Sequence, residues 1–166
     1  MTDAYIALGS NLDLPAAQLR RAVDAIASLA DCRIRTISNV YRSAAVGPGE
    51  QPDYLNAVLC LSTALAPLQL LDALQAIETA SGRVRTLRWG ARTLDLDILL
   101  YGEIALSGPR LTVPHPAMAE RNFVLYPLLE IAGPNLVLPG GTELGTLVAH
   151  CPRGSLVDTG RRLCGY

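Results

Sequence analysis

The sequence predicts an α+β domain of the ferredoxin-like type, in which a β-α-β-β-α-β chain order builds a mainly antiparallel sheet with helices packed on it. Four short segments have the apolar or alternating pattern of strands, and two segments between them carry apolar residues at helical spacing. The 166 residues suit a single domain over 1–166, and half of them are hydrophobic, enough for a substantial core. A C-terminal extension follows this core.

The first half of the chain is expected to supply a strand, a helix and a second strand. Residues 4–8 (AYIAL) form a short apolar strand that ends in the turn Gly9-Ser10-Asn11, where glycine and asparagine suit a reversal with positive φ. Pro15 is tolerated in a first helical turn, and the apolar spacing after it predicts a helix over about 15–30. Residues 32–42 alternate again and predict one continuous strand.

A loop and three more elements complete the expected core. Residues 43–53 contain two glycines and two prolines, which predict a loop of about ten residues. A third strand is expected over 54–65, a second helix over 67–81 and a fourth strand over 93–101. The inner stripe of the second helix is expected to consist of Leu70, Leu71, Leu74 and Ile77.

The sequence patterns that predict helices and strands are weaker beyond residue 101. A short strand is expected over 103–106, and the sequence Val-Pro-His-Pro at 113–116 predicts a rigid turn. A helix is expected over 117–131, interrupted at Pro127, and a short helix around 143–149. No role is assigned to residues 151–166.

The stretch 83–97 (RVRTLRWGARTLDLD) contains four arginines, one tryptophan and two aspartates in fifteen residues. Asp95 and Asp97 share one face of the expected strand, roughly 6.5 to 7 Å apart, and can converge on one divalent cation or bridge a pair. The arginines suit phosphate oxygens. Such an arrangement serves phosphoryl-type transfer. An exposed strand face whose aspartates merely pair with nearby arginines is the alternative.

Composition excludes several classes of function. The formal net charge of −1 argues against a surface devoted to polyanions such as nucleic acid. All 14 basic residues are arginines, so mechanisms that need a P-loop lysine or a Schiff base are excluded. No apolar run approaches the roughly 18 residues of a membrane span, and we expect a cytoplasmic protein with no membrane partner. The cysteines are expected to be reduced thiols at Cys32, Cys60, Cys151 and Cys164.

Several long motifs occur in a fixed order between residue 4 and about residue 131: YIALGSN, QPDYLNAV, GRVR, RWGARTLDLDILLYG, RLTVPHP and RNFVLYPL. With them the chain resembles the 6-hydroxymethyl-7,8-dihydropterin pyrophosphokinases of folate biosynthesis. In that family the terminal pyrophosphate of ATP moves to the pterin hydroxymethyl group, and AMP is released. The resemblance implies ATP as co-substrate, two Mg²⁺ ions and a monomer.

The resemblance also implies roles for individual residues. Asp95 and Asp97 would be the ligands of two Mg²⁺ ions that bridge the ATP phosphates. Arg83 and Arg92 would meet the phosphates as their loop closes, with Arg85 assisting. Trp89 would swing over both bound substrates and exclude water.

The remaining implied residues divide between the two substrates. His115 is assigned to binding, and no general base is named. A pterin is a flat bicycle with a hydrogen-bonding edge, so its site needs aromatic faces and matched donors and acceptors. On the nucleotide side the implied residues are Gln75, Glu78, Arg85, Trp89, Ile98, Arg110, Thr112, His115 and Arg121. On the pterin side they are Ser43, Ala44, Val46, Tyr54, Asn56, Trp89 and Phe123.

The chain departs from the family pattern at two places. Ser43-Ala44-Ala45 stands where well-known members have Thr-Pro-Pro, which predicts a less rigid pterin-side loop. Ala91 replaces a frequent proline in an arginine loop that looks about one residue shorter than in some members.

Two other classes of protein compete with the enzyme. An RNA-recognition module has the same element order but needs an aromatic-rich sheet and basic charge, and a regulatory small-molecule-binding domain has little use for paired strand aspartates.

Overall fold

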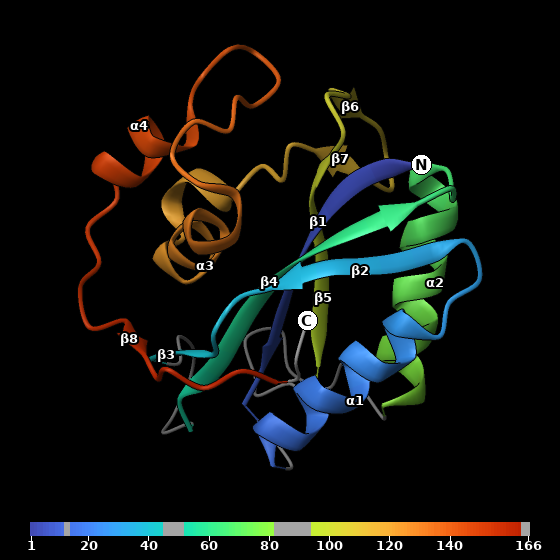
Figure 1. The fold of residues 1–166 in the computed structure, drawn as a ribbon, viewed down its shortest axis with the longest axis horizontal. Helices are drawn as coiled ribbons and strands as arrows, with labels where there is room; N and C mark the ends of the chain where they lie inside the picture. Colours follow the sequence, from blue (N-terminus) through green and yellow to red (C-terminus); the bar gives the residue numbers. More distant parts are fainter. Residues whose placement is uncertain (12–13, 45–51, 82–93, 164–166) are drawn as a thin grey trace.

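The structure, a computed structural model, describes residues 1–11, 14–44, 52–81 and 94–163. A six-stranded sheet runs through its centre in the order β5-β1-β4-β3-β8, with β2 also paired to β4, and each of these pairs is antiparallel (Figure 1). Two further strands, β6 (Leu106–Ser107) and β7 (Thr112–Val113), pair with each other. The strands of the main sheet are β1 (Thr2–Ser10), β2 (Cys32–Ile37), β3 (Tyr41–Ser43), β4 (Tyr54–Thr63), β5 (Asp95–Tyr101) and β8 (Val157–Asp158).

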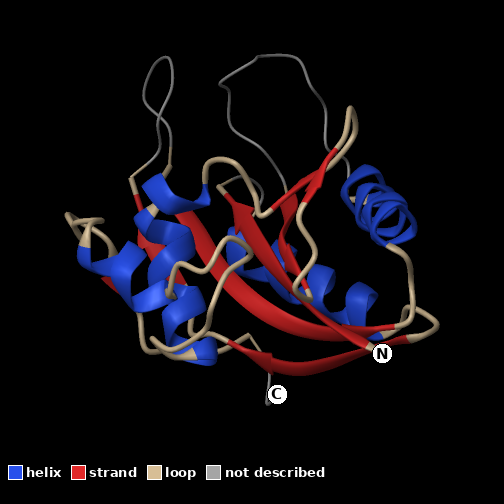
Figure 2. Ribbon diagram, turned by 90° about the horizontal axis from the view of Figure 1, so that it is seen from above, coloured by secondary structure: helices blue, strands red, loops and turns tan. Residues whose placement is uncertain are grey.

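Helices cover both faces of this sheet (Figures 1 and 2). On one face, α1 (Pro15–Ala27) and α2 (Pro67–Ala80) pack on the larger apolar cluster, as the ferredoxin-like pattern predicts. On the other face, α3 (Asn122–Ala132) and α4 (Leu144–Ala149) enclose a second cluster. Consecutive residues of β4 therefore enter different cores, which explains why this strand is apolar on both sides.

Strand β1 continues through Gly9 and Ser10, the first two residues of the expected turn. Gly9 pairs with Asn56 and Ser10 with Leu55, and Gly9 does not have the expected positive φ. A Cβ at Gly9 would lie 3.3 Å from Oδ1 of Asn56, so the glycine allows a close approach between strands rather than a reversal. The strand thus delivers its C-terminal end to the neighbourhood of Asn56.

The expected strand over 32–42 is wrong as one element, because it is divided into β2 and β3. The break centres on Ser38, a fully buried residue whose side chain takes part in the pairing with β4. The Ser38 N–H donates to the Val58 carbonyl (2.9 Å), and the Val58 N–H donates to Ser38 Oγ (3.0 Å). A hydroxyl therefore replaces a backbone carbonyl in the ladder, and the chain is free to turn before β3.

Strand β5 contains an extra residue. Ile98 pairs with Ile6 and Leu100 with Tyr5, so Leu99 has no partner in β1. This bulge reverses the expected alternation: Leu100 joins the cluster under α3, and Tyr101 joins the one under α1 and α2.

Several element boundaries also differ from expectation. Helix α1 ends at Ala27 rather than near residue 30, and the expected strand at 103–106 lies at Leu106–Ser107. The expected helix over 117–131 is a 3₁₀ turn (Met118–Glu120) followed by α3. Helix α3 continues through Pro127, which removes only the hydrogen bond that the Phe123 carbonyl would otherwise accept. The short helix expected around 143–149 is α4.

Among the described residues, none of the helices combines the length and hydropathy needed to cross a bilayer. Cys32, Cys60 and Cys151 are free thiols, while Cys164 lies outside the described residues. Burial raises the pKa of Cys60 to about 11, so this thiol stays protonated at neutral pH.

Candidate active site

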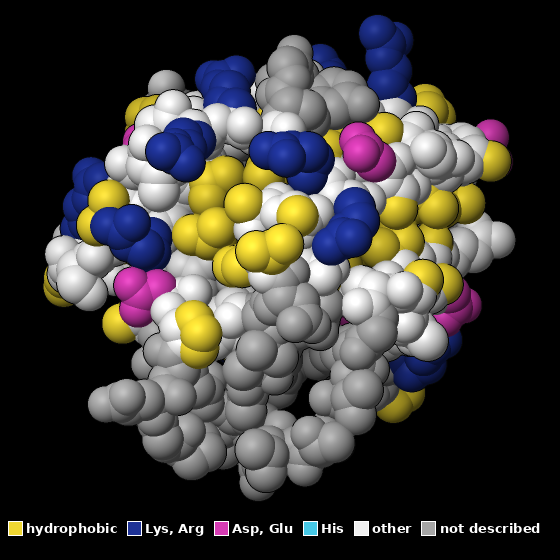
Figure 3. All heavy atoms as spheres, turned by 90° about the horizontal axis from the view of Figure 1, so that it is seen from below, with side chains coloured by type: hydrophobic (Ala, Val, Ile, Leu, Met, Phe, Trp, Pro, Cys, Tyr) yellow, Lys and Arg dark blue, Asp and Glu magenta, His cyan; other side chains and the backbone are white. Residues whose placement is uncertain are grey.

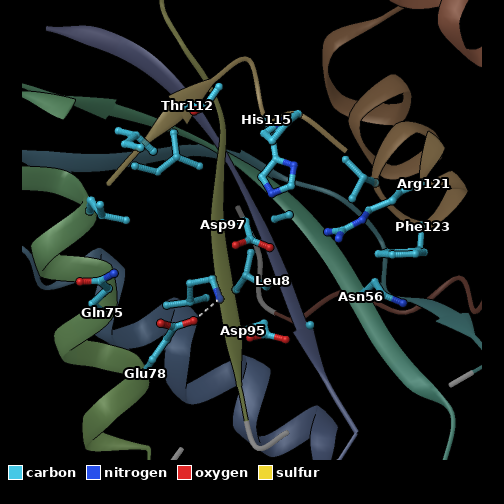
Figure 4. Close-up of a pocket in the computed structure, with 18 of the residues that line it drawn as sticks. Leu8, Asn56, Gln75, Glu78, Asp95, Asp97, Thr112, His115, Arg121 and Phe123 are labelled. Atoms are coloured by element: carbon cyan, nitrogen blue, oxygen red, sulfur yellow. Dashed lines mark hydrogen bonds between the residues drawn. The ribbon is translucent and has the colours of Figure 1, made fainter. Parts of the chain in front are cut away.

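A pocket of about 590 Å³ opens where three strands of the sheet bring their ends together (Figure 4). The antiparallel register places Gly9, near the end of β1, beside both Asn56 of β4 and Asp95 of β5. Helix α2, the β6–β7 segment and the start of α3 close the sides. A cavity of this size falls in the range of small-molecule sites.

The pocket collects every expected site residue that the structure describes. Five of the expected residues lie outside the described part of the chain: Val46, Arg83, Arg85, Trp89 and Arg92. The others all line the pocket: Ser43, Ala44, Tyr54, Asn56, Gln75, Glu78, Asp95, Asp97, Ile98, Arg110, Thr112, His115, Arg121 and Phe123.

Asp95 and Asp97 lie on the same side of β5, as their spacing predicts. Both side chains are half-buried and point to the side of β5 that faces Asn56 and Arg121 (Figure 4). The intervening Leu96 enters the core beneath α1 and α2. Two carboxylates consequently project into one cavity from a strand whose opposite face is anchored by apolar packing.

The backbone between these aspartates is held by Glu78 of α2. Glu78 is 6% exposed, and its Oε2 accepts the Leu96 N–H at 2.8 Å (Figure 4). Among the described strands β5 lies at the edge of the sheet, so this N–H pairs with a helix side chain instead of a neighbouring strand. Glu78 thus ties α2 to the strand that carries Asp95 and Asp97.

His115 is fixed above the pocket by two backbone groups. The backbone N–H of His115 donates to the carbonyl of Leu99, the bulged residue of β5, at 2.9 Å. The Ala117 N–H donates to His115 Nδ1 at 3.1 Å, which places the proton of the neutral ring on Nε2. Burial lowers the pKa of His115, Arg121 acts in the same direction, and Asp97 opposes them. The neutral ring can therefore offer Nε2–H as a donor.

Among the described residues, two arginines give the pocket positive charge. Arg110 donates from Nη2 to Asp72 Oδ1 at 2.6 Å and to Gln75 Oε1 at 3.3 Å, both on α2. Arg121 lies with its guanidinium 5.7 Å from the centre of the Phe123 ring and points into the cavity (Figure 4). Arg110 lies in the connection between β6 and β7, and Arg121 lies directly before α3.

The wall beside β4 combines aromatic and amide groups. Asn56 is 4% exposed and donates from Nδ2 to Ser43 Oγ at 2.8 Å. Ser43 is paired with Tyr54 across β3 and β4, and Phe123 of α3 stands opposite (Figure 4). The wall offers the features that a flat heterocycle requires, namely ring faces and a fixed amide.

Leu71 was expected in the core stripe of α2 and was not recognised from the sequence as a pocket residue. Leu71 lines the pocket, four residues before Gln75 and seven before Glu78. These spacings put all three on one helical face, so periodicity measured from Glu78 would have found it.

Comparison with known proteins agrees with this geometry. Residues 5–133 match the family model described as 7,8-dihydro-6-hydroxymethylpterin-pyrophosphokinase. The 2-amino-4-hydroxy-6-hydroxymethyldihydropteridine pyrophosphokinase of Pseudomonas aeruginosa is 56% identical over 148 residues, covering 89% of this chain and 91% of the relative. The enzyme of the same name from Haemophilus influenzae is 53% identical, covering 89% of this chain and 92% of the relative.

Solved structures share the fold at much lower identity. An HPPK-DHPS in complex with substrates superimposes with a TM-score of 0.71 at 13% identity, covering 90% of this chain. A Plasmodium falciparum HPPK-DHPS variant bound to pteroate gives 0.67 at 12%, again over 90% of this chain. The chain spans only 44% and 43% of those two proteins, so this likeness concerns the fold. From the family match and the two bacterial relatives, the chain belongs to the 7,8-dihydro-6-hydroxymethylpterin-pyrophosphokinase family.

Proposed function

We propose that this chain transfers pyrophosphate from ATP to 6-hydroxymethyl-7,8-dihydropterin, with Mg²⁺ as cofactor, and releases AMP and the pterin pyrophosphate ester for folate biosynthesis. Family membership supports the pyrophosphate transfer and the pterin acceptor. The observation that carries the rest is the single pocket in which Asp95 and Asp97 lie between a nucleotide-side wall and a pterin-side wall.

The two walls differ in chemistry. The wall formed by α2 and the β6–β7 segment carries Gln75, Arg110 and Thr112, whose donors and acceptors suit a ribose and a phosphate. The opposite wall carries Asn56 and Phe123, which suit the edge and face of a pterin. A polyphosphate that reaches from the first wall to the second passes the aspartates, where the transferred group must be held.

The donor set fits magnesium. Protein-bound Mg²⁺ is commonly held by one or two carboxylates together with substrate phosphates and water, and Asp95 and Asp97 provide two carboxylates on one strand face. Bound Mg²⁺ would neutralise charge on the phosphate oxygens.

The described residues have distinct proposed tasks around this centre. His115 donates from Nε2–H to an oxygen of the nucleotide, because Nδ1 is already used by Ala117. Arg121 brings positive charge from the start of α3. Arg83, Arg85, Arg92 and Trp89, which lie outside the described residues, retain the roles that the family resemblance implies.

An assay that separates AMP from ADP tests this function most directly. With ATP, the pterin and Mg²⁺, we expect AMP and the pterin pyrophosphate ester in equal amounts, because a pyrophosphoryl transfer cleaves between the α and β phosphates. Chelation of Mg²⁺ should stop product formation. Formation of ADP, or turnover that survives chelation, would refute the proposal.

Two finer features belong to the same proposal. The family resemblance implies a monomer, and light scattering of the purified protein would test it. The cytoplasmic location proposed from the sequence is tested by cell fractionation.

The RNA-recognition alternative loses support from the fold. Such modules bind through an open sheet face. Here α3 packs on β4 across that face and buries Val58, Leu99 and Leu100. On the face shown in Figure 3, separate arginines surround apolar side chains and do not merge into a continuous basic surface.

A further inference from the structure

The C-terminal segment, to which the sequence assigns no role, lies along the outer edge of β3. Strand β8 pairs Asp158 with Tyr41 and Val157 with Arg42 (Figure 1). These tail residues lie outside the span 5–133 that the family model matches. Strand β3 is only three residues long, and its other edge pairs with the part of β4 that lines the pocket.

The tail also binds the two residues that precede β3. The Val40 N–H donates to the Arg161 carbonyl at 2.7 Å, and the Val40 carbonyl accepts from the N–H and the hydroxyl of Thr159 at 3.0 and 2.6 Å. The Asn39 side chain donates to the Asp158 carboxylate at 3.2 and 3.4 Å. The short connection between β2 and β3 is therefore held by hydrogen bonds from the tail.

Glu130 holds the same connection from the side of α3. Its two carboxylate oxygens accept the Asn39 N–H at 3.1 and 3.0 Å, and Oε1 accepts the Tyr41 hydroxyl at 2.8 Å. Burial, followed by the bond to Glu130, raises the pKa of Tyr41, so the hydroxyl remains a donor at neutral pH. Tyr41 is 5% exposed, which leaves its ring little freedom to move.

This bond connects β3 and α3, the two elements that position Asn56 and Phe123 in the proposed pterin-side wall. Glu130 follows Phe123 by seven residues, about two helical turns, on the same helix. Tyr41 precedes Ser43 by two residues on β3, and Ser43 orients the Asn56 amide at 2.8 Å. A displacement of β3 relative to α3 would change the separation between Phe123 and Asn56.

We propose that Glu130 and the tail residues 157–162 position the pterin-side wall, by holding β3 at a fixed spacing from α3. This inference deepens the proposed function and rests on it. Glu130 and Tyr41 act through Phe123, Ser43 and Asn56, and neither lines the pocket. They are positioning residues rather than contacts to the substrate.

The test compares the KM and Kd values for the pterin and for ATP in two variants that nearly keep side-chain volume and two that truncate the side chain. Tyr41→Phe removes only the hydroxyl, and Glu130→Gln removes the charge but leaves one neutral oxygen that can accept from both Asn39 and Tyr41. Glu130→Ala and Asp158→Ala remove the ties from α3 and from the tail. Glu103→Ala, which removes an exposed carboxylate beyond the far end of β5, is the control.

We expect Tyr41→Phe to raise KM and the equilibrium Kd for the pterin about fivefold, the effect of one lost hydrogen bond, while KM for ATP stays within about twofold. Glu130→Ala also removes the acceptor of the Asn39 N–H and should raise the pterin constants at least as much, with the same limit on KM for ATP. Asp158→Ala should shift the pterin constants in the same direction. Glu130→Gln should lie between Glu130→Ala and the parent, and Glu103→Ala should match the parent. If Glu130 and the tail served only stability, these variants would lower the melting temperature without this difference between the two substrates.

Equal changes in both KM values, or pterin constants that stay at the parent value, would overturn the inference. If the parent protein made no AMP, the proposed function would fail instead. The pterin Kd of the variants would then still decide whether the wall is positioned by Glu130.

Discussion

Asp97 illustrates how single side chains acquire their orientation in this pocket. The pleat of β5 puts it on the same side as Asp95, and apolar neighbours on the other side keep the strand from rotating. The Glu78 carboxylate fixes the backbone between the two aspartates at Leu96. The spacing of the two carboxylates is thus set before any ligand arrives, which would reduce the entropic cost of binding the proposed Mg²⁺.

Replacing Asp97 with alanine should abolish most of the activity without unfolding the protein. We expect AMP formation to fall by roughly 10²–10³-fold or more, because charge on the transferred group loses a main element of its neutralisation. The side chain is half-buried on an edge strand, so the free energy of unfolding should change by about 1 kcal/mol or less. Asp3→Ala, on the neighbouring β1 and outside the pocket, is the matched control. Near-normal turnover of Asp97→Ala would refute the metal assignment.

The low pKa of His115 predicts a pH dependence of stability. Since burial lowers its pKa in the folded protein below the usual value of about 6.5, the unfolded chain binds more protons between the two values. The free energy of unfolding should therefore rise with pH in this window. The contribution of His115 should be fully present above a pH of about 6.5 and should be lost as the pH falls through its lowered pKa. Urea unfolding between pH 5 and pH 7.5, at roughly half-unit steps, measures this slope.

His115→Gln should flatten that slope. His150→Gln removes the second, exposed histidine and should retain the pH dependence of the parent. An identical slope in His115→Gln and the parent would show that His115 is not the titrating group.

At the scale of elements, the bulge in β5 links the sheet to the Pro-His-Pro turn. Leu99 has no partner in β1, and its carbonyl accepts the His115 N–H. Period-two alternation predicted the face of Asp95, Asp97 and Leu96, which precede the bulge. It failed for Leu100 and Tyr101, because one inserted residue reverses the faces of all that follow.

Strand β5 pairs with β1 and also supplies the carbonyl that holds His115, and deletion of Leu99 should separate these two roles. The pairs on either side of the bulge would remain in register, while His115 would lose its acceptor. We expect the free energy of unfolding to fall by roughly 2–5 kcal/mol, because Leu99 is 1% exposed, and KM for ATP to rise more than KM for the pterin. Leu128→Ala removes a fully buried leucine from the same cluster and should lower stability alone. If both variants changed the two KM values alike, the tether would have no role in nucleotide binding.

Local patterns predicted most of the elements but not the contacts that shape their ends. The helices α1 and α2 followed from apolar spacing and from Pro15 and Pro67 at their first positions. Gly9 was read as a turn residue, since a sequence does not show that Asn56 approaches it from another strand. Ser38 was read as part of a strand for the same reason: its hydroxyl replaces a ladder carbonyl only in the folded sheet. Long motifs, in contrast, grouped His115 and Phe123 with Asp95 and Asp97, and the fold places all four in one pocket.

At the scale of the whole molecule, the sheet separates two cores that have different relations to the family match. The cluster under α1 and α2 lies almost entirely within residues 5–133. The cluster under α3 extends beyond that span, to Leu138, Leu144 and Cys151, each of which is less than a tenth exposed. The segment after residue 133 is therefore part of the core rather than an appendage.

A chain that ends at residue 133 should consequently fail to form the native pocket. It would lose the buried side chains of Leu138, Leu144, Cys151, Leu156 and Leu163. Each buried leucine contributes roughly 1.5–3 kcal/mol, so the sum reaches the usual stability of a domain, about 5–15 kcal/mol. It would also lose β8 and with it the hydrogen bonds along Val40 and β3. We expect the shortened chain to bind a dye specific for exposed apolar surface, to melt without cooperativity and to lose measurable pterin binding. Leu138→Ala in the full chain is the graded control, with a lower melting temperature but a cooperative transition. A shortened chain that melted cooperatively at the temperature of the full chain would show that the sheet and its first three helices are stable by themselves.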